Sequence, residues 1–315
     1  MSSPPKIFDR DLLLRHRERA ARSETIPDFL LERTAEDLSD RLAVTNRTFK
    51  DALNLSASTG QLERAFQLLS NVRSIASSES SKALAEFARS RVLADVLVVD
   101  EEMLAFEAES YDLITSALTL QYVNDLPGTL TQIRRALKPD GLFMGALVGG
   151  ATLTELRQAT LAAEEELTGG ASPRVAPMAD VRDLGALLQR AGFALPVADS
   201  DVITVTYQTA FDLMRELKAM GASNVLMERR RVPMTRSLVT RIAEIYQERF
   251  ATEDGRIAAT FEILTMTGWA PHESQQQPLR PGSARSRLAD ALGTTERATG
   301  DTAGVPKNGD RPDDE

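Results

Sequence analysis

The spacing of apolar residues along the chain predicts helices first and an alternation of strands and helices afterwards. Two helical stretches open the sequence, and in the second the side chains of Leu31, Ala35, Leu38 and Leu42 share one face, with Asp28 as its expected N-cap. Short apolar runs then follow at intervals. We expect strands at residues 52–55, 96–99, 111–117, 142–148, 202–207 and 258–269.

Helical patterns fill the intervals between these strands. We expect helices at residues 61–69, 125–137, 153–167 and 181–191, and a mostly helical stretch at 210–250. Asp125 is suited to cap one of them, because Pro127 falls in its first turn. Alternating strands and helices predict an α/β fold with a parallel sheet covered on both faces. A helical insertion at about residues 208–252 is then available to cover a pocket at the sheet edge.

Three parts of the chain differ in composition. Residues 1–46 are predicted to form an N-terminal helical segment, and residues 47–270 a main domain that contains the insertion. Residues 271–315 are rich in Gln, Pro, Ser, Arg, Asp and Gly. Because this tail has few large apolar groups, we expect it to be extended and largely disordered.

Composition and charge narrow the classes of function. Hydrophobic residues make up 42% of the 315 positions, enough for a sizeable core. The formal net charge of -9 disfavours nucleic acid as a partner, since phosphate binding requires a basic face. The absence of cysteine excludes a disulfide framework and cysteine metal sites. The two histidines, His16 and His272, are far apart in sequence, so no metal site is predicted.

The sequence also bears on targeting. No apolar run approaches the roughly 20 residues of a membrane span, and no secretory signal is recognisable. Arginines near the N-terminus resemble those of a mitochondrial presequence, but Asp9, Asp11, Glu18 and Glu24 stand among them, and such presequences are poor in acids. We therefore expect a cytoplasmic protein.

Candidate binding residues cluster in three turns that follow predicted strands, at residues 54–60, 100–106 and 116–127. Ligands of open parallel sheets bind outside the carboxyl ends of the strands. Simpler roles remain open: the first turn can be a serine-rich helix cap, and Asp100 with Glu101 a solvated strand end. Asp125 is better explained as a cap than as a catalytic acid. Three apolar residues of the last turn are better explained as core: Leu118, Leu120 and Val123.

The region from Tyr111 to Gly141 carries a recognisable pattern. A strand that begins Tyr-Asp-Leu is followed by Asn124-Asp125-Leu126-Pro127, a helix, and Leu137-Lys138-Pro139-Asp140-Gly141. This arrangement resembles the class I S-adenosylmethionine-dependent methyltransferases. The resemblance implies a Rossmann-like, mostly parallel sheet of seven strands with helices on both faces and a helical insertion before the last strand.

Further motifs resemble the malonyl-carrier-protein methyltransferases and, more closely, the complex I assembly factor 5 family. They include irregular loops as well as generic fold motifs, and the similarity spans about residues 6–285. The motifs lie at residues 7–10, 149–157, 183–185, 190–193, 220–224 and 268–275.

This resemblance assigns cofactor positions. The first turn of methyltransferases has an acid and three glycines, which let the backbone approach the methionine part of the cofactor. Here Asn54, Ser56, Ser58 and Gly60 occupy those positions. The acid that binds both ribose hydroxyls is expected to end the second strand, near residues 70–71, where Ser70 and Asn71 offer no carboxylate.

The remaining assignments follow from the second and third turns. Asp100 is expected to accept a hydrogen bond from the adenine amino group, and Leu104 and Phe106 to line the ring's pocket. Glu101 and Ser116 complete the cofactor-binding set. The candidates for a substrate role are Gln121 and Tyr122, on the loop that faces the methyl group in this fold.

Three hypotheses of function follow. The first is an S-adenosylmethionine-binding enzyme that modifies a protein or helps to assemble it; methyl transfer chiefly requires in-line positioning. The resembled family is associated with arginine hydroxylation of a respiratory subunit, a reaction for which this sequence has no oxidant or metal motif. The second is a non-catalytic scaffold, suggested by the loss of two of three cofactor anchors.

The third hypothesis is a malonyl-carrier-protein methyltransferase, which should have a basic surface for its acidic carrier. The overall acidity disfavours it. A basic run at residues 229–231 is either a solvated helix end or a docking point for an acidic protein.

Overall fold

The computed structural model describes residues 6–23, 26–92, 95–276, 290 and 293–295. Met1–Glu273 forms one compact unit and Ser274–Glu315 a second. The tail predicted at 271–315 lies outside the described residues except for 271–276, 290 and 293–295.

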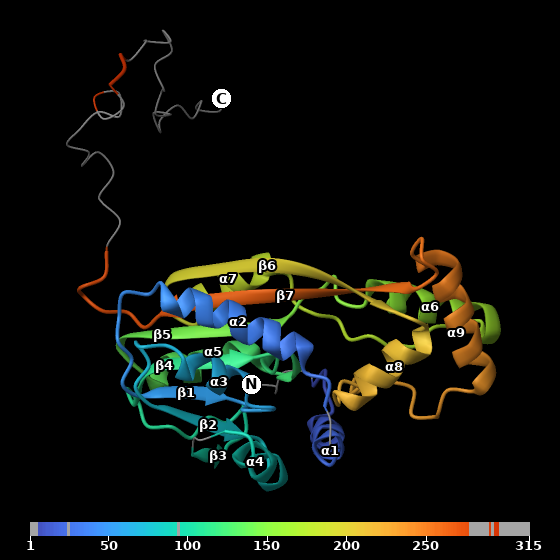
Figure 1. Ribbon diagram of the computed structural model, residues 1–315, viewed down its shortest axis with the longest axis horizontal. Coiled ribbons are helices and arrows are strands. Elements are labelled where there is room, and N and C mark those ends of the chain that lie inside the picture. The colour runs from blue at the N-terminus through green and yellow to red at the C-terminus, as the bar shows by residue number, and fades with distance from the viewer. Residues whose placement is uncertain (1–5, 24–25, 93–94, 277–289, 291–292, 296–315) are drawn as a thin grey trace, which may run out of the picture. The chain divides into compact units, whose positions relative to one another are not determined.

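A sheet of seven strands forms the centre of the first unit, in the order β3-β2-β1-β4-β5-β7-β6 (Figure 1). Strand β7 runs antiparallel to both neighbours, and the other pairs are parallel. The predicted α/β fold with a mostly parallel sheet is confirmed. The strands are β1 (Ala52–Leu55), β2 (Ile75–Glu79), β3 (Val96–Val98), β4 (Tyr111–Ala117), β5 (Leu137–Val148), β6 (Ala194–Tyr207) and β7 (Ile257–Trp269).

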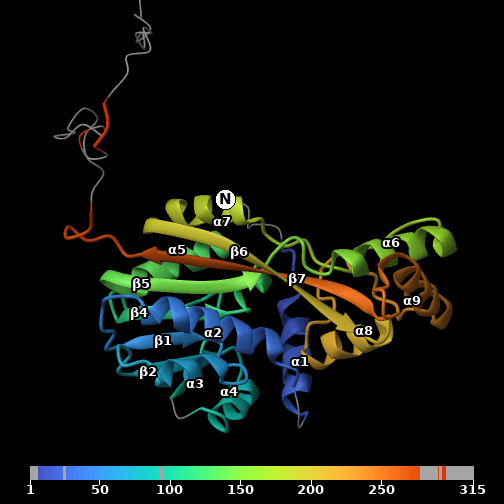
Figure 2. The same cartoon turned by 45° about the horizontal axis from the view of Figure 1, so that its top comes forward.

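Helices cover both faces of this sheet. Those that pack on it or beyond its end are α1 (Arg10–Ala21), α2 (Phe29–Ala43), α3 (Gln61–Gln67), α4 (Lys82–Arg89), α5 (Leu126–Ala136), α6 (Thr154–Thr168), α7 (Val181–Arg190), α8 (Ala210–Ala219) and α9 (Arg236–Phe250). Helices α2 and α3 lie on one face, and α5 and α7 on the other (Figures 1 and 2). Helix α1 lies beyond the carboxyl ends of β1 and β2, and α6, α8 and α9 gather around the far ends of β6 and β7.

Two apolar layers hold the sheet between its helices. On one face Leu38 of α2 and Phe66 of α3 pack in a cluster with Leu113 of β4. On the other face Leu130 of α5 and Leu184 of α7 pack in a cluster that includes residues of β1, β4 and β5. Burial of these side chains, worth about 1.5–3 kcal/mol each, fixes the strand ends at one edge.

The two predicted caps have different outcomes. The Asp125 side chain accepts a hydrogen bond from the backbone N–H of Gly128 at 2.9 Å, and Pro127 lies in the first turn, which confirms the prediction. Asp28 occupies the N-cap position of α2 as predicted, but its side chain makes no capping hydrogen bond. Its carboxylate instead accepts a hydrogen bond from Gln61 at the start of α3.

Strand β2 and helix α4 were not predicted from the sequence. Ser77 and Ser78 in β2 are fully buried between β1 and β3, so a strand of small polar residues occupies an interior position. Strand β6 begins at Ala194 rather than near residue 202, because Pro196 falls at an irregularity of an edge strand, where proline is tolerated.

Candidate functional site

A cavity of about 720 Å³ lies at the carboxyl ends of β1, β2 and β4 and extends under α1, α6, α8 and α9. Its volume falls within the range usual for small-molecule sites. The cavity has two unlike walls, which we call the polar wall and the apolar wall. The polar wall comprises Arg17, Ser58, Thr59, Glu79, Gln121 and Tyr122, and the apolar wall Leu156, Phe211, Met214, Leu217, Ile242 and Phe261.

The first turn keeps a left-handed backbone although two glycines of the family pattern are serines. The φ angles of Ser56, Ser58 and Gly60 are 70°, 49° and 79°. A non-glycine residue in this conformation costs on the order of 1–3 kcal/mol and persists only where its surroundings fix it. Here the Ser56 hydroxyl donates to Glu101 Oε1 at 3.0 Å, and the Ser58 N–H donates to Glu79 Oε1 at 2.6 Å.

Two other residues of this turn have structural contacts. Asn54 is buried, does not line the cavity, and donates from Nδ2 to Glu63 Oε1 at 2.8 Å. Burial raises the pKa of the Glu63 carboxyl, which this amide and the Ser77 hydroxyl partly offset. A Cβ on Gly60 would come within 2.6 Å of Val92, so Gly60 allows close packing there.

Glu79 is the carboxylate at the end of the second strand. The expected position near Ser70 or Asn71 was wrong, because β2 begins at Ile75 and ends at Glu79. Glu79 is buried and lines the cavity, and its carboxylate accepts the backbone N–H of Ser58 and interacts with the backbone of Ser80. Burial raises its pKa to about 7, and the Ser58 N–H and the charge of Arg17 offset only part of this effect. A carboxylate can accept about four hydrogen bonds, so Glu79 has capacity for a ligand.

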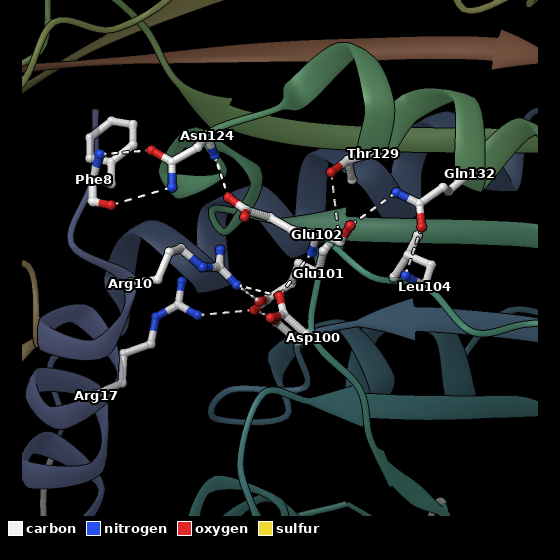
Figure 3. Close-up of polar contacts among 11 residues, drawn as sticks. Phe8, Arg10, Arg17, Asp100, Glu101, Glu102, Leu104, Asn124, Thr129 and Gln132 are labelled. Atoms are coloured by element: carbon white, nitrogen blue, oxygen red, sulfur yellow. Dashed lines mark hydrogen bonds and ion pairs between the residues drawn. The ribbon is translucent and has the colours of Figure 1, made fainter. Parts of the chain in front are cut away.

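The two acids after β3 differ in burial. The Asp100 side chain is 52% exposed, does not line the cavity, and binds Arg10 at 2.8 Å. Glu101 is 2% exposed, and its Oε1 accepts from Arg17 at 3.1 Å while Oε2 accepts from Arg10 (Figure 3). Burial alone would raise the pKa of Glu101, but the charges of Arg17 and Arg10 outweigh it and hold the pKa below its ordinary value. Of the two residues that were predicted as a possible solvated strand end, Asp100 is exposed to solvent and Glu101 is buried.

The substrate candidates Gln121 and Tyr122 both line the cavity. Gln121 Nε2 donates to the Leu118 carbonyl at 2.7 Å, and because a carbonyl only accepts, the amide oxygen is the free end. Within the described residues this buried Oε1 has no hydrogen-bond partner. The Tyr122 ring contacts the edge of Phe8, and the Arg17 guanidinium lies 5.7 Å from its centroid.

Other predicted residues lie away from the cavity. Ser116 is buried beneath it, and Leu104 packs in the main core. Phe106 packs against Tyr111 with ring centroids 5.4 Å apart. Leu104 and Phe106, which were expected to line the adenine pocket, do not line this cavity. Two residues predicted as core, Leu120 and Val123, are core, whereas Leu118 also lines the cavity.

The sequence reasoning missed Glu79, Thr59, Arg10 and Arg17 as residues of the site. Arg10 belongs to the Ile7–Arg10 motif that carried the resemblance. Asn124 holds the start of this motif, because its Oδ1 accepts the backbone N–H groups of Ile7 and Phe8 at 2.8 Å (Figure 3). The two motifs bind each other across 116 residues.

The basic run at residues 229–231 does not end a helix, since it lies in the loop between α8 and α9. Arg229 binds Asp9 at 2.9 Å, and Arg230 and Arg231 are exposed. No group of three acidic or histidine side chains among the described residues is placed to hold a metal ion. No helix in the described part of the chain is long and apolar enough to cross a membrane.

Comparison with known proteins identifies the class. Residues 53–145 match the methyltransferase domain family. A solved structure from Bacillus halodurans C-125, assigned as a methyltransferase, superposes with a TM-score of 0.53 at 15% identity, covering 76% of this chain and all of that one. At this identity the likeness shows the fold alone. Sheet order, cavity and domain match together define a class I methyltransferase-like protein.

The sequence relatives define the family within that class. The arginine-hydroxylase NDUFAF5 of Danio rerio is 38% identical over 286 residues, which cover 90% of this chain and 89% of the relative. The chain belongs to the NDUFAF5 family, as its motifs predicted. The malonyl-[acyl-carrier protein] O-methyltransferase of Methylovorus is more distant, at 28% identity over 92% of this chain and all of that protein.

These relatives correct the predicted location. The NDUFAF5 proteins of zebrafish, human and mouse are all named as mitochondrial. The cytoplasmic location predicted from the acidic residues of the N-terminus was wrong. The structure gives one of them, Asp9, another role, since its side chain caps α1 by accepting the Leu12 N–H at 3.0 Å.

Proposed function

We propose that the cavity binds S-adenosylmethionine and that the protein uses it to act on a side chain of a partner protein. The observation that carries this proposal is Glu79, a buried carboxylate that ends β2 and lines the cavity beside the first turn. In the resembled fold an acid at this position accepts both ribose hydroxyls. Buried polar groups are normally paired, so a carboxylate held here with spare acceptors suits a ligand that donates hydrogen bonds.

The fit of the other residues supports the same ligand. Ser58 and Thr59 of the first turn line the cavity, and the Thr59 hydroxyl is buried without a hydrogen-bond partner in the described residues. The left-handed turn follows the path that glycines would give it. When bound, the cofactor would supply a methyl group carried by a positively charged sulfur. The protein's part is to orient it and to exclude water with α1 and the apolar wall.

The apolar wall supports a role on the substrate side. Phe211, Met214 and Leu217 come from α8, and Ile242 from α9, so the segment at about 208–252 supplies much of this wall. We propose that this segment is an insertion in the main domain of residues 47–270 and that it receives the partner's side chain. Gln121 lines the same cavity, and its buried amide oxygen, which has no hydrogen-bond partner among the described residues, would accept a hydrogen bond from that side chain.

The scaffold hypothesis is the second candidate, and one observation favours it. The Ser56 and Asp100 side chains, both expected at the cofactor, are engaged by Glu101 and Arg10 instead. A protein of this kind would keep the fold and the partner surface without binding the nucleoside.

Calorimetric titration with S-adenosylmethionine and S-adenosylhomocysteine separates the two candidates. We expect micromolar binding by the unaltered protein and a loss of at least about 100-fold in Glu79→Ala, because two hydrogen bonds to a charged acceptor are removed. Asp100→Ala is the matched control and should bind within about threefold of the unaltered protein. Absence of heat and of a thermal shift at millimolar ligand would sink the enzyme proposal in favour of the scaffold.

A further inference from the structure

Helix α1 brings two arginines to the sheet edge, and they differ in one respect. Arg10 and Arg17 are seven residues apart, which is two helical turns, so both project from the same side of α1 toward Glu101 (Figure 3). Arg17 lines the cavity and Arg10 does not. Two residues with a common partner thus differ in access to a ligand.

The position of the Arg17 guanidinium follows from a shared oxygen atom. Glu101 Oε1 accepts both the Ser56 hydroxyl at 3.0 Å and Arg17 Nη1 at 3.1 Å. Arg17 is therefore beside the first turn, where the amino-acid portion of the cofactor is expected. The ring of Tyr122 lies on another side of the guanidinium, at 5.7 Å.

The charges around the two arginines are unequally matched. Arg10 contacts two carboxylates, those of Asp100 and Glu101, whereas among the described residues Arg17 has one ion pair, with Oε1 of Glu101, and its charge also partly offsets the raised pKa of Glu79. A guanidinium has five N–H donors, and within the described residues Arg17 uses one of them in a hydrogen bond. A guanidinium with free donors can bind a carboxylate through two parallel hydrogen bonds.

The segment that begins helix α1 is held by contacts within the protein. Asn124 holds the backbone of Ile7 and Phe8, and Asp9 binds Arg229 at 2.9 Å. An arginine on a fixed helix loses less side-chain and backbone freedom on binding, so more of the interaction energy remains as affinity.

We propose that Arg17 binds the carboxylate of the cofactor's amino-acid portion. The inference rests on the proposed function, and it makes the N-terminal segment of residues 1–46 part of the binding site. It also explains how a turn with serines in place of glycines holds this end of the ligand, since a charged side chain compensates for restricted approach of the backbone.

The test compares two ligands that differ only in the contested portion. S-adenosylhomocysteine carries the amino acid, and 5′-methylthioadenosine keeps the adenine, ribose and sulfur without it. For Arg17→Gln we expect S-adenosylhomocysteine to bind about 10- to 100-fold more weakly, while 5′-methylthioadenosine stays within about threefold. Arg10→Gln, which loses the same Glu101 partner outside the cavity, should change the two affinities by equal factors.

Three results would overturn the inference in distinguishable ways. An equal loss of both ligands in Arg17→Gln would mean that Arg17 acts only through Glu101, and an unchanged affinity for S-adenosylhomocysteine would exclude the contact. Binding of neither nucleoside by the unaltered protein would instead defeat the proposed function itself. If Arg17→Gln does not fold, Arg17→Lys keeps the positive charge and should still weaken S-adenosylhomocysteine alone, by several-fold, because the two-pronged geometry is lost.

Discussion

The polar wall and the apolar wall of the cavity are built in different ways. The apolar wall continues the protein core, and Ile242 and Phe261 belong to the same cluster as the fully buried Tyr246. The polar wall includes two features that cost stability, the left-handed backbone of Ser58 and the buried carboxylate of Glu79. Strained backbone and buried charges are retained in proteins where they serve a functional site. The difference between the two walls therefore favours the polar wall as the part that binds the polar groups of a ligand.

The two walls also differ in how substitution affects them. In the first turn Ser56 and Ser58 stand where the resemblance to methyltransferases places glycines, yet the backbone is left-handed at both, and Glu101 and Glu79 accept hydrogen bonds from this turn. A motif defined by residue types can thus degrade while the conformation that it encodes persists. The apolar wall has no comparable requirement beyond volume and polarity.

The largest expected effect is at Glu101. Glu101→Ala leaves the partly buried guanidinium of Arg17 without its ion-pair partner and deprives Arg10 of one carboxylate, so we expect a loss of about 3–5 kcal/mol in the free energy of unfolding. Urea denaturation measures it. Asp100→Ala removes the half-exposed neighbour and should cost no more than about 1 kcal/mol. Similar losses in both variants would refute the distinction between the two acids.

Substitution of a core residue in the apolar wall should reduce stability without reducing the affinity for the nucleoside. Ile242 is fully buried, so Ile242→Ala should cost about 2–5 kcal/mol through lost burial and a larger cavity. Because Ile242 belongs to the apolar wall, affinity for S-adenosylhomocysteine should stay within about threefold. A large loss of nucleoside affinity in a folded variant would show that the cofactor occupies the apolar wall instead.

Glu79 should make the stability of the fold depend on pH. Its pKa is raised from 4.5 to about 7, so between these values the folded state holds a proton that the unfolded state has lost. Stability attributable to Glu79 is therefore full below about pH 4.5 and falls as pH rises to 7, by about 3 kcal/mol in total. Unfolding of the protein and of Glu79→Gln at pH 5 and pH 8 measures this. Parallel pH profiles would contradict it.

The smallest effect is expected at Ser58. Ser58→Gly relieves a left-handed serine but adds freedom to the unfolded chain, so stability should change by no more than about 1 kcal/mol. Because the side chain lines the cavity, affinity for S-adenosylhomocysteine should rise a few-fold. Gly60→Ser is the contrasting change and should destabilise the protein, since a Cβ there approaches Val92 at 2.6 Å. Weaker nucleoside binding in Ser58→Gly would mean that the serine contributes to the site.

Sequence patterns predicted most of the sheet but not the element that carries the key acid. A strand such as Val96–Val98 is predicted by an unbroken run of apolar residues, whereas Ile75–Glu79 contains two serines and a glutamate. Its interior position becomes evident only once β1 and β3 lie on either side of it. The ribose-binding acid was therefore sought several residues too early.

The arginines of α1 show a second limit. Arg10 and Arg17 are separated from Glu101 by more than 80 residues, and nothing in the local pattern links them. A charged residue on a helix is by default solvated. Only the docking of α1 through Asn124 and Arg229 turns these two side chains toward the sheet edge.

Proton release on ligand binding tests the central claim most directly. Accepting two ribose hydroxyls requires ionised Glu79, and at pH 6.5 a pKa of about 7 leaves roughly three-quarters of the sites protonated. Titration with S-adenosylhomocysteine at pH 6.5, in buffers of different ionisation enthalpy, should therefore show release of up to about 0.75 proton per site by the protein and none by Glu79→Gln. Equal heats of binding in all buffers would contradict the assignment of this carboxylate to the cofactor, and so would an equal affinity of the unaltered protein and Glu79→Gln for S-adenosylhomocysteine.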